Sequence, residues 1–157
     1  MNRNHLMFST NLLAFALSAC FLLDASAQNK AADYAVNKRV VIQATAEEQA
    51  HVLTEMNGFL SSLHTINAAL AVKDFALVAK TALMHGPNHG EKSAVELSFE
   101  AKAPADWRVF ASPMRKGFAE IAKAAQIDPS VERVVAQLGK VTQNCVACHA
   151  TFKITSP

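Results

Sequence analysis

Apolar residues recur every three or four positions over most of the chain after residue 45, and this period predicts amphipathic helices. A first helix is predicted over 46–72, because Thr45 and Glu48 have the spacing of a capping box just before an apolar stripe. That stripe comprises Val52, Met56, Phe59, Leu60, Leu63, Ile66 and Leu70. A shorter second helix is predicted to begin after Asp74 and to end at Gly86 and Pro87.

Two further helices are predicted after a long connection over 86–103, which is expected to hold at most one weak helical turn. The third begins at Pro104, and Pro113 either kinks it or separates two shorter helices. Its stripe comprises Trp107, Phe110, Met114, Phe118, Ile121 and Ala125. The fourth begins at Asp128 and Pro129, and its stripe comprises Val131, Val134, Val135, Leu138, Val141, Cys145, Cys148, His149 and Phe152.

Residues 28–44 fit no helix, although Arg39 to Ile42 have the pattern of a short extended lead-in. No strand pattern is seen elsewhere. Four amphipathic helices bury their stripes by packing together, so the predicted fold class is all-α, an antiparallel four-helix bundle. A single domain over 28–157 is expected, since a chain of this length supports one core.

The N-terminus has the features of a secretory signal peptide over 1–27. A positively charged start precedes an apolar run over 6–23, and Ala25 to Ala27 give an A-x-A cleavage site before Gln28. A membrane-spanning anchor is disfavoured, because the run is short and contains polar residues. Lipidation at Cys20 is the alternative, since the residues before it resemble a lipoprotein processing box. Both interpretations predict an exported protein without a stable membrane span after processing.

The overall charge is nearly balanced, with 15 Lys and Arg against 13 Asp and Glu and a formal net charge of +2. This balance argues against nucleic-acid binding, which normally requires a basic patch or tract. The chain has three cysteines, so loss of Cys20 with the signal peptide would leave only Cys145 and Cys148.

These two cysteines belong to the segment CVACH, Cys145 to His149, which predicts a c-type haem attachment site. At i, i+3 and i+4 of a helix, two thiols and an imidazole share one face, where the thiols bond one haem and the imidazole ligates its iron. Because the three residues continue the apolar stripe of the fourth helix, the haem is expected inside the bundle.

Three alternatives for this segment are weaker. A thioredoxin-like pair would need a βαβ context, and no strand pattern surrounds the motif. A structural zinc site would need a fourth ligand from elsewhere, and no second cysteine pair exists to supply it. A disulfide would leave His149 unexplained.

The stretch NCVACHATFK, the segment HVLTEMNGFL of the first helix and the order of elements resemble the class II c-type cytochromes, the cytochrome c′ and cytochrome c-556 group. The resemblance implies thioether bonds from Cys145 and Cys148 to one haem c, with His149 as the proximal iron ligand. It also implies haem attachment in the periplasm and a homodimer through the first two helices. It covers most of the mature chain, but only the C-terminal motif is specific.

The resemblance further implies that a residue of the first helix faces the distal side of the iron, and Met56 is the candidate. A methionine there would give a six-coordinate, one-electron carrier between redox partner proteins, which is not an enzyme. If Met56 only fills the core, the protein would be five-coordinate and would bind or sense gases such as NO or CO. A haem subunit of a larger oxidoreductase is a third hypothesis.

Other histidines and methionines are weaker distal candidates. His64 lies at the edge of the first stripe and ranks second. His51 is expected to point away from that stripe, and His85 and His89 are expected to be solvated. Met84 and Met114 are expected to be packing residues. Trp107 and Phe110 are expected in the core, and Arg108, Arg115, Lys140 and Lys153 on a solvated face.

Overall fold

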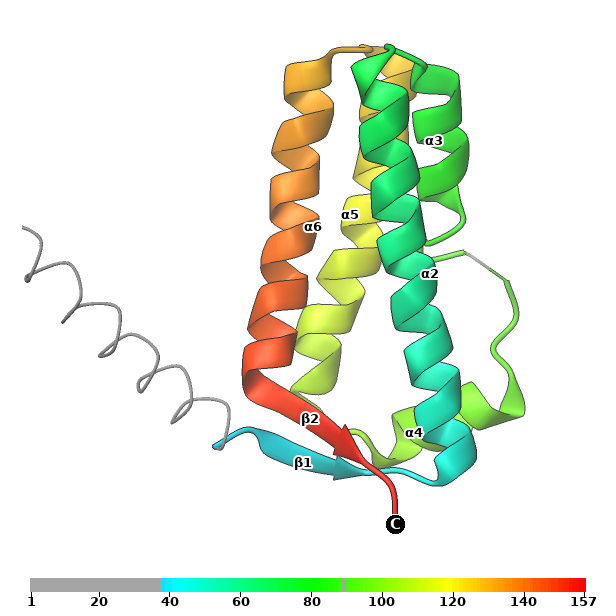
Figure 1. Ribbon diagram of the computed structural model, residues 1–157, viewed down its shortest axis with the longest axis vertical. Helices are drawn as coiled ribbons and strands as arrows, with labels where there is room; N and C mark the ends of the chain where they lie inside the picture. Colours follow the sequence, from blue (N-terminus) through cyan, green and yellow to red (C-terminus); the bar gives the residue numbers. More distant parts are fainter. Residues whose placement is uncertain (1–37, 89) are drawn as a thin grey trace, which may run out of the picture. The chain divides into compact units, whose positions relative to one another are not determined.

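The described part of the chain contains five helices and two short strands, and most of its residues are helical (Figure 1). The computed structural model describes residues 38–88 and 90–157. The elements in chain order are β1 (Val40–Gln43), α2 (Ala46–Ala71), α3 (Phe75–Leu83), α4 (Ala94–Lys102), α5 (Trp107–Ile127), α6 (Val131–Thr151) and β2 (Phe152–Thr155). This content is compatible with the predicted all-α class. The predicted signal peptide over 1–27, with Cys20, lies outside the described residues.

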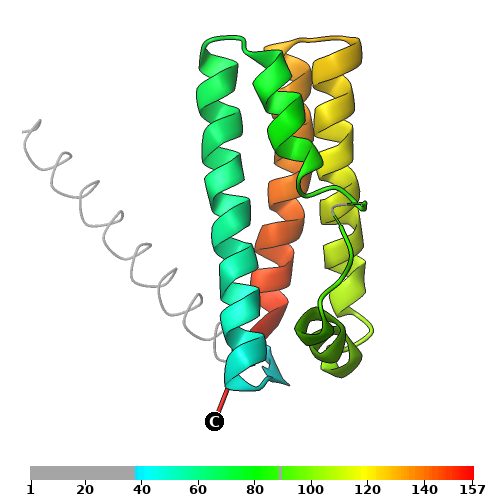
Figure 2. The same ribbon diagram turned by 90° about the vertical axis from the view of Figure 1, so that its right-hand side faces the viewer.

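α2, α3, α5 and α6 stand side by side; α2 and α5 run in one direction, and α3 and α6 run in the other (Figures 1 and 2). α5 packs against both α6 and α3, while α2 packs against α3 and α4. α4 and the strands lie at the end of the molecule where α2 begins and α6 ends (Figure 1). Within the described residues, no helix is both long enough and apolar enough to cross a membrane.

Local capping signals set the starts of α2 and α3 as predicted. The hydroxyl of Thr45 accepts a hydrogen bond from the Glu48 N–H at 3.2 Å, and the Thr45 N–H donates to the Glu48 carboxylate at 2.7 Å. This capping box satisfies two of the backbone N–H groups that a helix start leaves without partners. The Asp74 carboxylate likewise accepts the Leu77 N–H at 2.9 Å and caps α3.

The prediction of at most one weak turn over 86–103 is wrong, because α4 occupies nine of these residues. The Ser93 hydroxyl caps the helix by accepting the Glu96 N–H at 3.1 Å. Phe99 is buried on the inner face of α4 and anchors this short helix. The Ser-x-x-Glu pattern is a local signal for a helix start. The prediction relied instead on the Gly and Pro residues just before it.

α5 begins at Trp107 and not at Pro104. The residues between them form a turn in which the Trp107 N–H donates to the Pro104 carbonyl at 2.8 Å. α5 then continues as one helix through Pro113, so the alternative of two shorter helices is wrong. Pro113 is exposed on the outer side of α5.

α6 begins after Ser130, so the predicted start at Asp128 and Pro129 is wrong. The Ser130 hydroxyl accepts a backbone N–H of the first turn at 3.3 Å. Asp128 instead closes α5, because its N–H donates to a carbonyl of the last turn of that helix at 3.3 Å. Phe152, predicted as part of the helical stripe, follows α6 and is the first residue of β2.

The expectation of a structure without strands is also wrong. The extended lead-in predicted at Arg39 to Ile42 is confirmed as β1, and β1 pairs in parallel with β2 at the other end of the chain. Strands of four residues are too short to give a clear alternating pattern, and periodicity carries no information on a distant partner.

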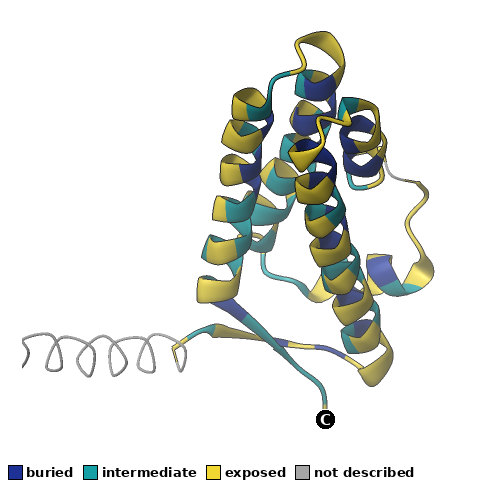
Figure 3. Cartoon of the chain, turned by 45° about the horizontal axis from the view of Figure 1, so that its top comes forward, coloured by how far each residue is buried: buried dark blue, intermediate teal, exposed yellow. Residues whose placement is uncertain are grey.

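The buried apolar residues form two clusters, here named the upper and lower core. The upper core comprises Phe59, Ile66, Ala69, Leu70, Val78, Ala79, Ala82, Phe118, Ile121, Ala122, Ala125, Val134, Leu138 and Val141. The lower core comprises Ile42, Ala44, Val52, Phe99 and Phe152. The fully buried residues of α5 therefore come from its second half and those of α6 from its first half (Figure 3).

Two apolar residues of the predicted stripes are on the surface. Leu60 is 65% exposed and Val135 is 51% exposed, so their predicted burial is wrong. Both stripes are wider than the face that neighbouring helices cover.

α5 and α6 approach each other closely at Gly117. A Cβ atom at this position would lie 2.5 Å from Cγ2 of Val141.

A buried carboxylate ties the start of α2 to α4. Glu48 is 2% exposed and accepts hydrogen bonds from the Lys102 ammonium at 2.7 and 2.9 Å and from the Ser98 hydroxyl at 2.7 Å. These hydrogen bonds lower the pKa of Glu48 from 4.5 to about 2, and the bond from Lys102 has the largest effect. The ionised carboxylate is therefore favoured by the folded state.

We expect this carboxylate to contribute to acid unfolding. Its lowered pKa stabilises the fold fully above pH 4.5, and this stabilisation is lost as the pH falls toward about 2. Urea unfolding measured through this pH range should show stability falling with pH, and Glu48→Gln should flatten that dependence by about one proton. Glu47→Gln, at the exposed neighbouring position, should keep the wild-type slope. Equal slopes for Glu48→Gln and wild type would contradict the assignment.

Candidate functional site

The CVACH segment forms the last turns of α6, immediately before β2. Cys145 and Cys148 are half-buried, their thiols are not joined in a disulfide, and Cys148 packs against the lower core. His149 is exposed, so the prediction that it continues the buried stripe is wrong. It follows Cys148 directly and therefore lies about 100° around the helix from it.

The thiols have raised pKa values. Burial raises the pKa of Cys145, and burial together with the neighbouring Cys145 raises the pKa of Cys148 to about 11. Reactive C-x-x-C pairs have lowered pKa values, so these thiols have the opposite electrostatic character. Among the described residues, no group of three or more His, Cys, Asp or Glu side chains could hold a metal ion. A zinc site built from protein ligands alone thus has no support in this region.

Met56 lies on α2 and is half-buried between the two cores. It packs against the upper core and also against the lower core, the cluster that Cys148 borders from α6. The sulfur-bearing residues of α2 and α6 therefore flank the same apolar region. α2 and α6 are not among the closely packed helix pairs of the described chain.

The other distal candidates lie in different surroundings. His64 is exposed. His85 packs against the rings of Phe59 and Phe118, with centroid distances of 4.6 and 5.2 Å, and its Nε2 is 2.7 Å from the Ser62 hydroxyl. These contacts hold it against the upper core, so the prediction of a solvated His85 is wrong. His89 lies outside the described residues. Met84 is 56% exposed, so the expectation that it is a packing residue is wrong, whereas Met114 packs against the upper core as expected.

A polar group centred on Arg115 lies beside Met56. The Arg115 guanidinium donates to the Glu55 carboxylate at 3.0 Å, lies 4.0 Å from Glu96 and sits 5.7 Å from the centroid of the Phe59 ring. Its side chain is 18% exposed, so the prediction of a solvated Arg115 is wrong. Glu55, Glu96 and Arg115 come from three helices, and no local sequence signal indicates that they meet.

Two atoms of this region are buried without a hydrogen-bond partner: Nε2 of His51 and Oε1 of Glu96. Nε2 of His51 lies 4.0 Å from the nearest Glu55 oxygen, beyond hydrogen-bonding distance. Buried polar atoms are normally satisfied by protein, water or ligand. The region next to Met56 therefore offers polar atoms that a bound molecule could satisfy.

Aromatic rings line the lower core next to Cys148. Trp107 lies 5.4 Å from Phe99 and 5.8 Å from Phe152 between ring centroids, and Phe110 lies 6.1 Å from Phe152. Trp107 and Phe110 are half-buried and pack against the lower core, as expected of core residues. They belong to the first half of α5, whose apolar face is less covered than the second half (Figure 3).

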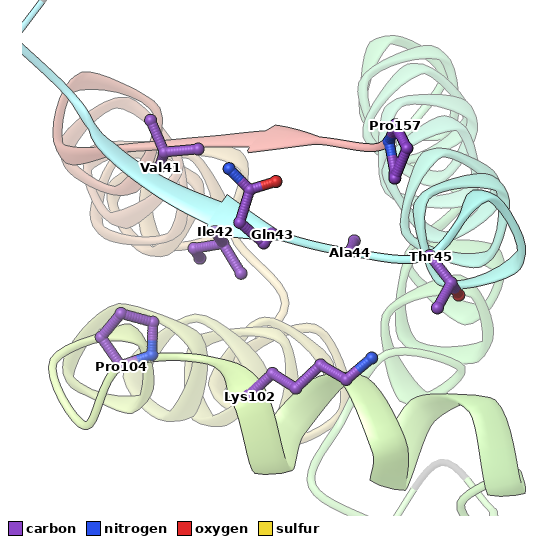
Figure 4. Close-up of a pocket in the computed structure, with 8 residues that line it drawn as sticks. All are labelled: Val41, Ile42, Gln43, Ala44, Thr45, Lys102, Pro104 and Pro157. Atoms are coloured by element: carbon purple, nitrogen blue, oxygen red, sulfur yellow. The ribbon is translucent and has the colours of Figure 1, made fainter.

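A separate pocket lies between β1 and α4 (Figure 4). The pocket is lined by residues 41–45 on one side and by Lys102 and Pro104 on the other, with Pro157 also contributing. None of these residues belongs to the CVACH segment. The Lys102 ammonium already binds Glu48, so this pocket has little free charge with which to recognise a ligand.

Comparison of the chain with protein-family models, curated proteins and solved structures finds no match. Its function is therefore inferred from its own residues and their geometry. The two thiols have the spacing of haem attachment, and the imidazole of His149 and the thioether of Met56 are groups that can ligate haem iron. Half-buried aromatic rings pack against the same lower core as Cys148. Carboxylate-rich chemistry of the kind that binds hard cations is absent from this set of residues.

Proposed function

We propose that this protein is a periplasmic monohaem c-type cytochrome that carries single electrons between redox partner proteins. Its fold would be an antiparallel four-helix bundle of α2, α3, α5 and α6 enclosing one covalently attached haem c. The observation that carries the proposal is the CVACH segment on α6, with Cys148 bordering the same lower core as Met56 on α2.

The surroundings of the segment support a fit for haem. The first half of α5 and the second half of α6 keep apolar stripes that are only half-buried, and a large apolar ring would cover them. Next to this region, the unsatisfied Nε2 of His51 could hydrogen-bond to the edge of such a group. Arg115 is already paired with Glu55 and lies 4.0 Å from Glu96, so these three side chains add no net positive charge there.

Each protein residue would have a distinct role. Cys145 and Cys148 would hold the group by thioether bonds, so that it stays attached during repeated redox cycles. His149 would be the proximal ligand, and the Met56 thioether the distal ligand that favours the reduced state. Bound haem would supply an iron that gains and loses one electron. The apolar cores would keep its surroundings poor in water and its coordination constant.

The remaining parts of the proposal follow from the N-terminal sequence and the family resemblance. Export would follow cleavage after Ala27, with lipidation at Cys20 as the alternative. The homodimer implied by the resemblance would use α2 and α3. On α2, Leu53 and Leu60 are 58% and 65% exposed. No enzymatic reaction and no nucleic-acid partner are proposed.

A five-coordinate protein that binds or senses NO or CO is the second candidate. The observation favouring it is that Met56 packs against both cores, as a residue that merely fills space would do. In that case the distal side of the iron would remain open to a gas.

The test is to purify the protein after export and to measure its mass and absorption spectrum. We expect the mass of the processed chain plus one haem, and sharp low-spin bands in both oxidation states that carbon monoxide does not change. A high-spin spectrum that shifts with carbon monoxide would favour the gas-binding candidate. A mass equal to that of the polypeptide alone would refute both.

A further inference from the structure

The two strands pair the segment just before α2 with the segment just after α6. β1 precedes α2, β2 follows α6, and the two pair in parallel with Val40 opposite Phe152 and Ile42 opposite Ile154. The pairing continues beyond the strands, because the Ala44 N–H donates to the Thr155 carbonyl at 2.9 Å. This strand pair, Val40–Gln43 with Phe152–Thr155, is here named the clasp.

Phe152 links the clasp directly to the last turn of α6. Its N–H donates to the carbonyl of Cys148 and so closes the helix end. Its ring is 5% exposed and packs between Trp107 and Phe110, in the lower core that Cys148 also contacts. His149 lies in the turn between the Cys148 carbonyl and this anchor.

A helix end is the part of a helix that opens most easily, since its last carbonyl groups have no partners within the helix. In the described residues, β2 follows α6 directly. An isolated two-stranded sheet is only marginally stable, so the clasp depends on the burial of Ile42, which is 2% exposed, and of Phe152 in the lower core. The strands and the last turn should therefore open together.

We propose that the clasp is a positioning element for His149: by closing the last turn of α6, it holds the imidazole in one orientation toward the iron. The ligand role of His149 rests on the proposed function, whereas the coupling of the clasp to the turn does not. The residues that act through His149 are Phe152, at the helix end, and Ile42, on the opposite strand.

The coupling is tested by amide hydrogen exchange on the purified full chain. Ile42→Ala removes apolar packing from β1 without changing any residue of α6 or β2. We expect the amides of residues 149–152 to exchange about tenfold faster than in the wild type, together with those of β2. Val41→Ala, at an outer position of the same strand that is 42% exposed, should leave these rates unchanged.

The effect on His149 is tested by electron paramagnetic resonance of the oxidised protein. A loosened turn allows several imidazole orientations, so Ile42→Ala should broaden the haem signal, while Ile42→Leu should restore the wild-type line width. Deletion of residues 153–157 should have the same effect as Ile42→Ala. The deletion variant replaces Ile42→Ala in both measurements if Ile42→Ala fails to fold.

Faster exchange at residues 153–155 with unchanged rates at residues 149–152 would overturn the coupling. Faster exchange at both with an unchanged haem signal would overturn the positioning role. A wild type without haem would refute the proposed function, and the exchange experiment would still decide whether the clasp closes the last turn.

Discussion

Replacing both Cys145 and Cys148 with alanine is expected to abolish covalent haem attachment completely. Each thioether bond requires a cysteine sulfur, and the described chain contains no other cysteine. Both side chains are only half-buried, so alanine should remove little packing and the helices should still form. The measurement is the mass of the denatured chain, in which only covalently bound haem is retained.

The matched control is Cys20→Ala, which changes the one remaining cysteine of the chain. It should keep the full haem mass, because that position is outside the attachment motif. It also separates the two processing alternatives, since lipidation at Cys20 would add a lipid mass that the variant loses. Retention of the haem mass in the double variant would contradict the assignment of the CVACH segment.

Met56→Ala is expected to have the second largest effect, by removing the distal ligand. The low-spin spectrum should convert to a high-spin one, and the midpoint potential should fall because a thioether favours the reduced iron. A distal ligand bound in about 99% of molecules lowers the apparent affinity for carbon monoxide about a hundredfold. The variant should therefore bind carbon monoxide roughly a hundredfold more tightly, which a gas titration followed by absorption measures.

Met114→Ala is the matched control for this substitution. Met114 is also half-buried and packs against the upper core, so both variants should lose about 2 kcal/mol of stability or less. Only Met56→Ala should change the spectrum and the gas affinity. If Met56→Ala keeps the low-spin spectrum, another residue is the ligand. If the wild type already binds carbon monoxide as tightly as the variant, the gas-binding candidate is favoured.

The helices were predictable where their signals are local. The capping box of Thr45 and Glu48 and the Asp74 cap predicted the starts of α2 and α3, because these bonds join residues three apart. Ser93 gives the same kind of local signal for α4. The prediction missed it because it relied on the turn-forming residues before Ser93. At the start of α6, the cap is Ser130 and not the predicted Asp128, whose backbone N–H closes α5.

The candidate site was only partly predictable. The spacing within CVACH indicated which residues share one side of α6, but not that His149 would be exposed at the helix end. Charge patterning treated Arg115 as solvated, whereas it binds Glu55 on another helix. Burial of a charged group depends on partners that lie far away in the sequence.

The sequence by itself determined four of the five described helices, the caps of α2 and α3, and the CVACH segment of the last helix. These features depend on hydrogen bonds and side-chain neighbours within about four residues. Only the tertiary structure decided that Met56 borders the same lower core as Cys148, and that β1 and β2 close the end of α6. Such contacts join residues about a hundred positions apart, and they form only when the packing of the whole chain brings their elements together.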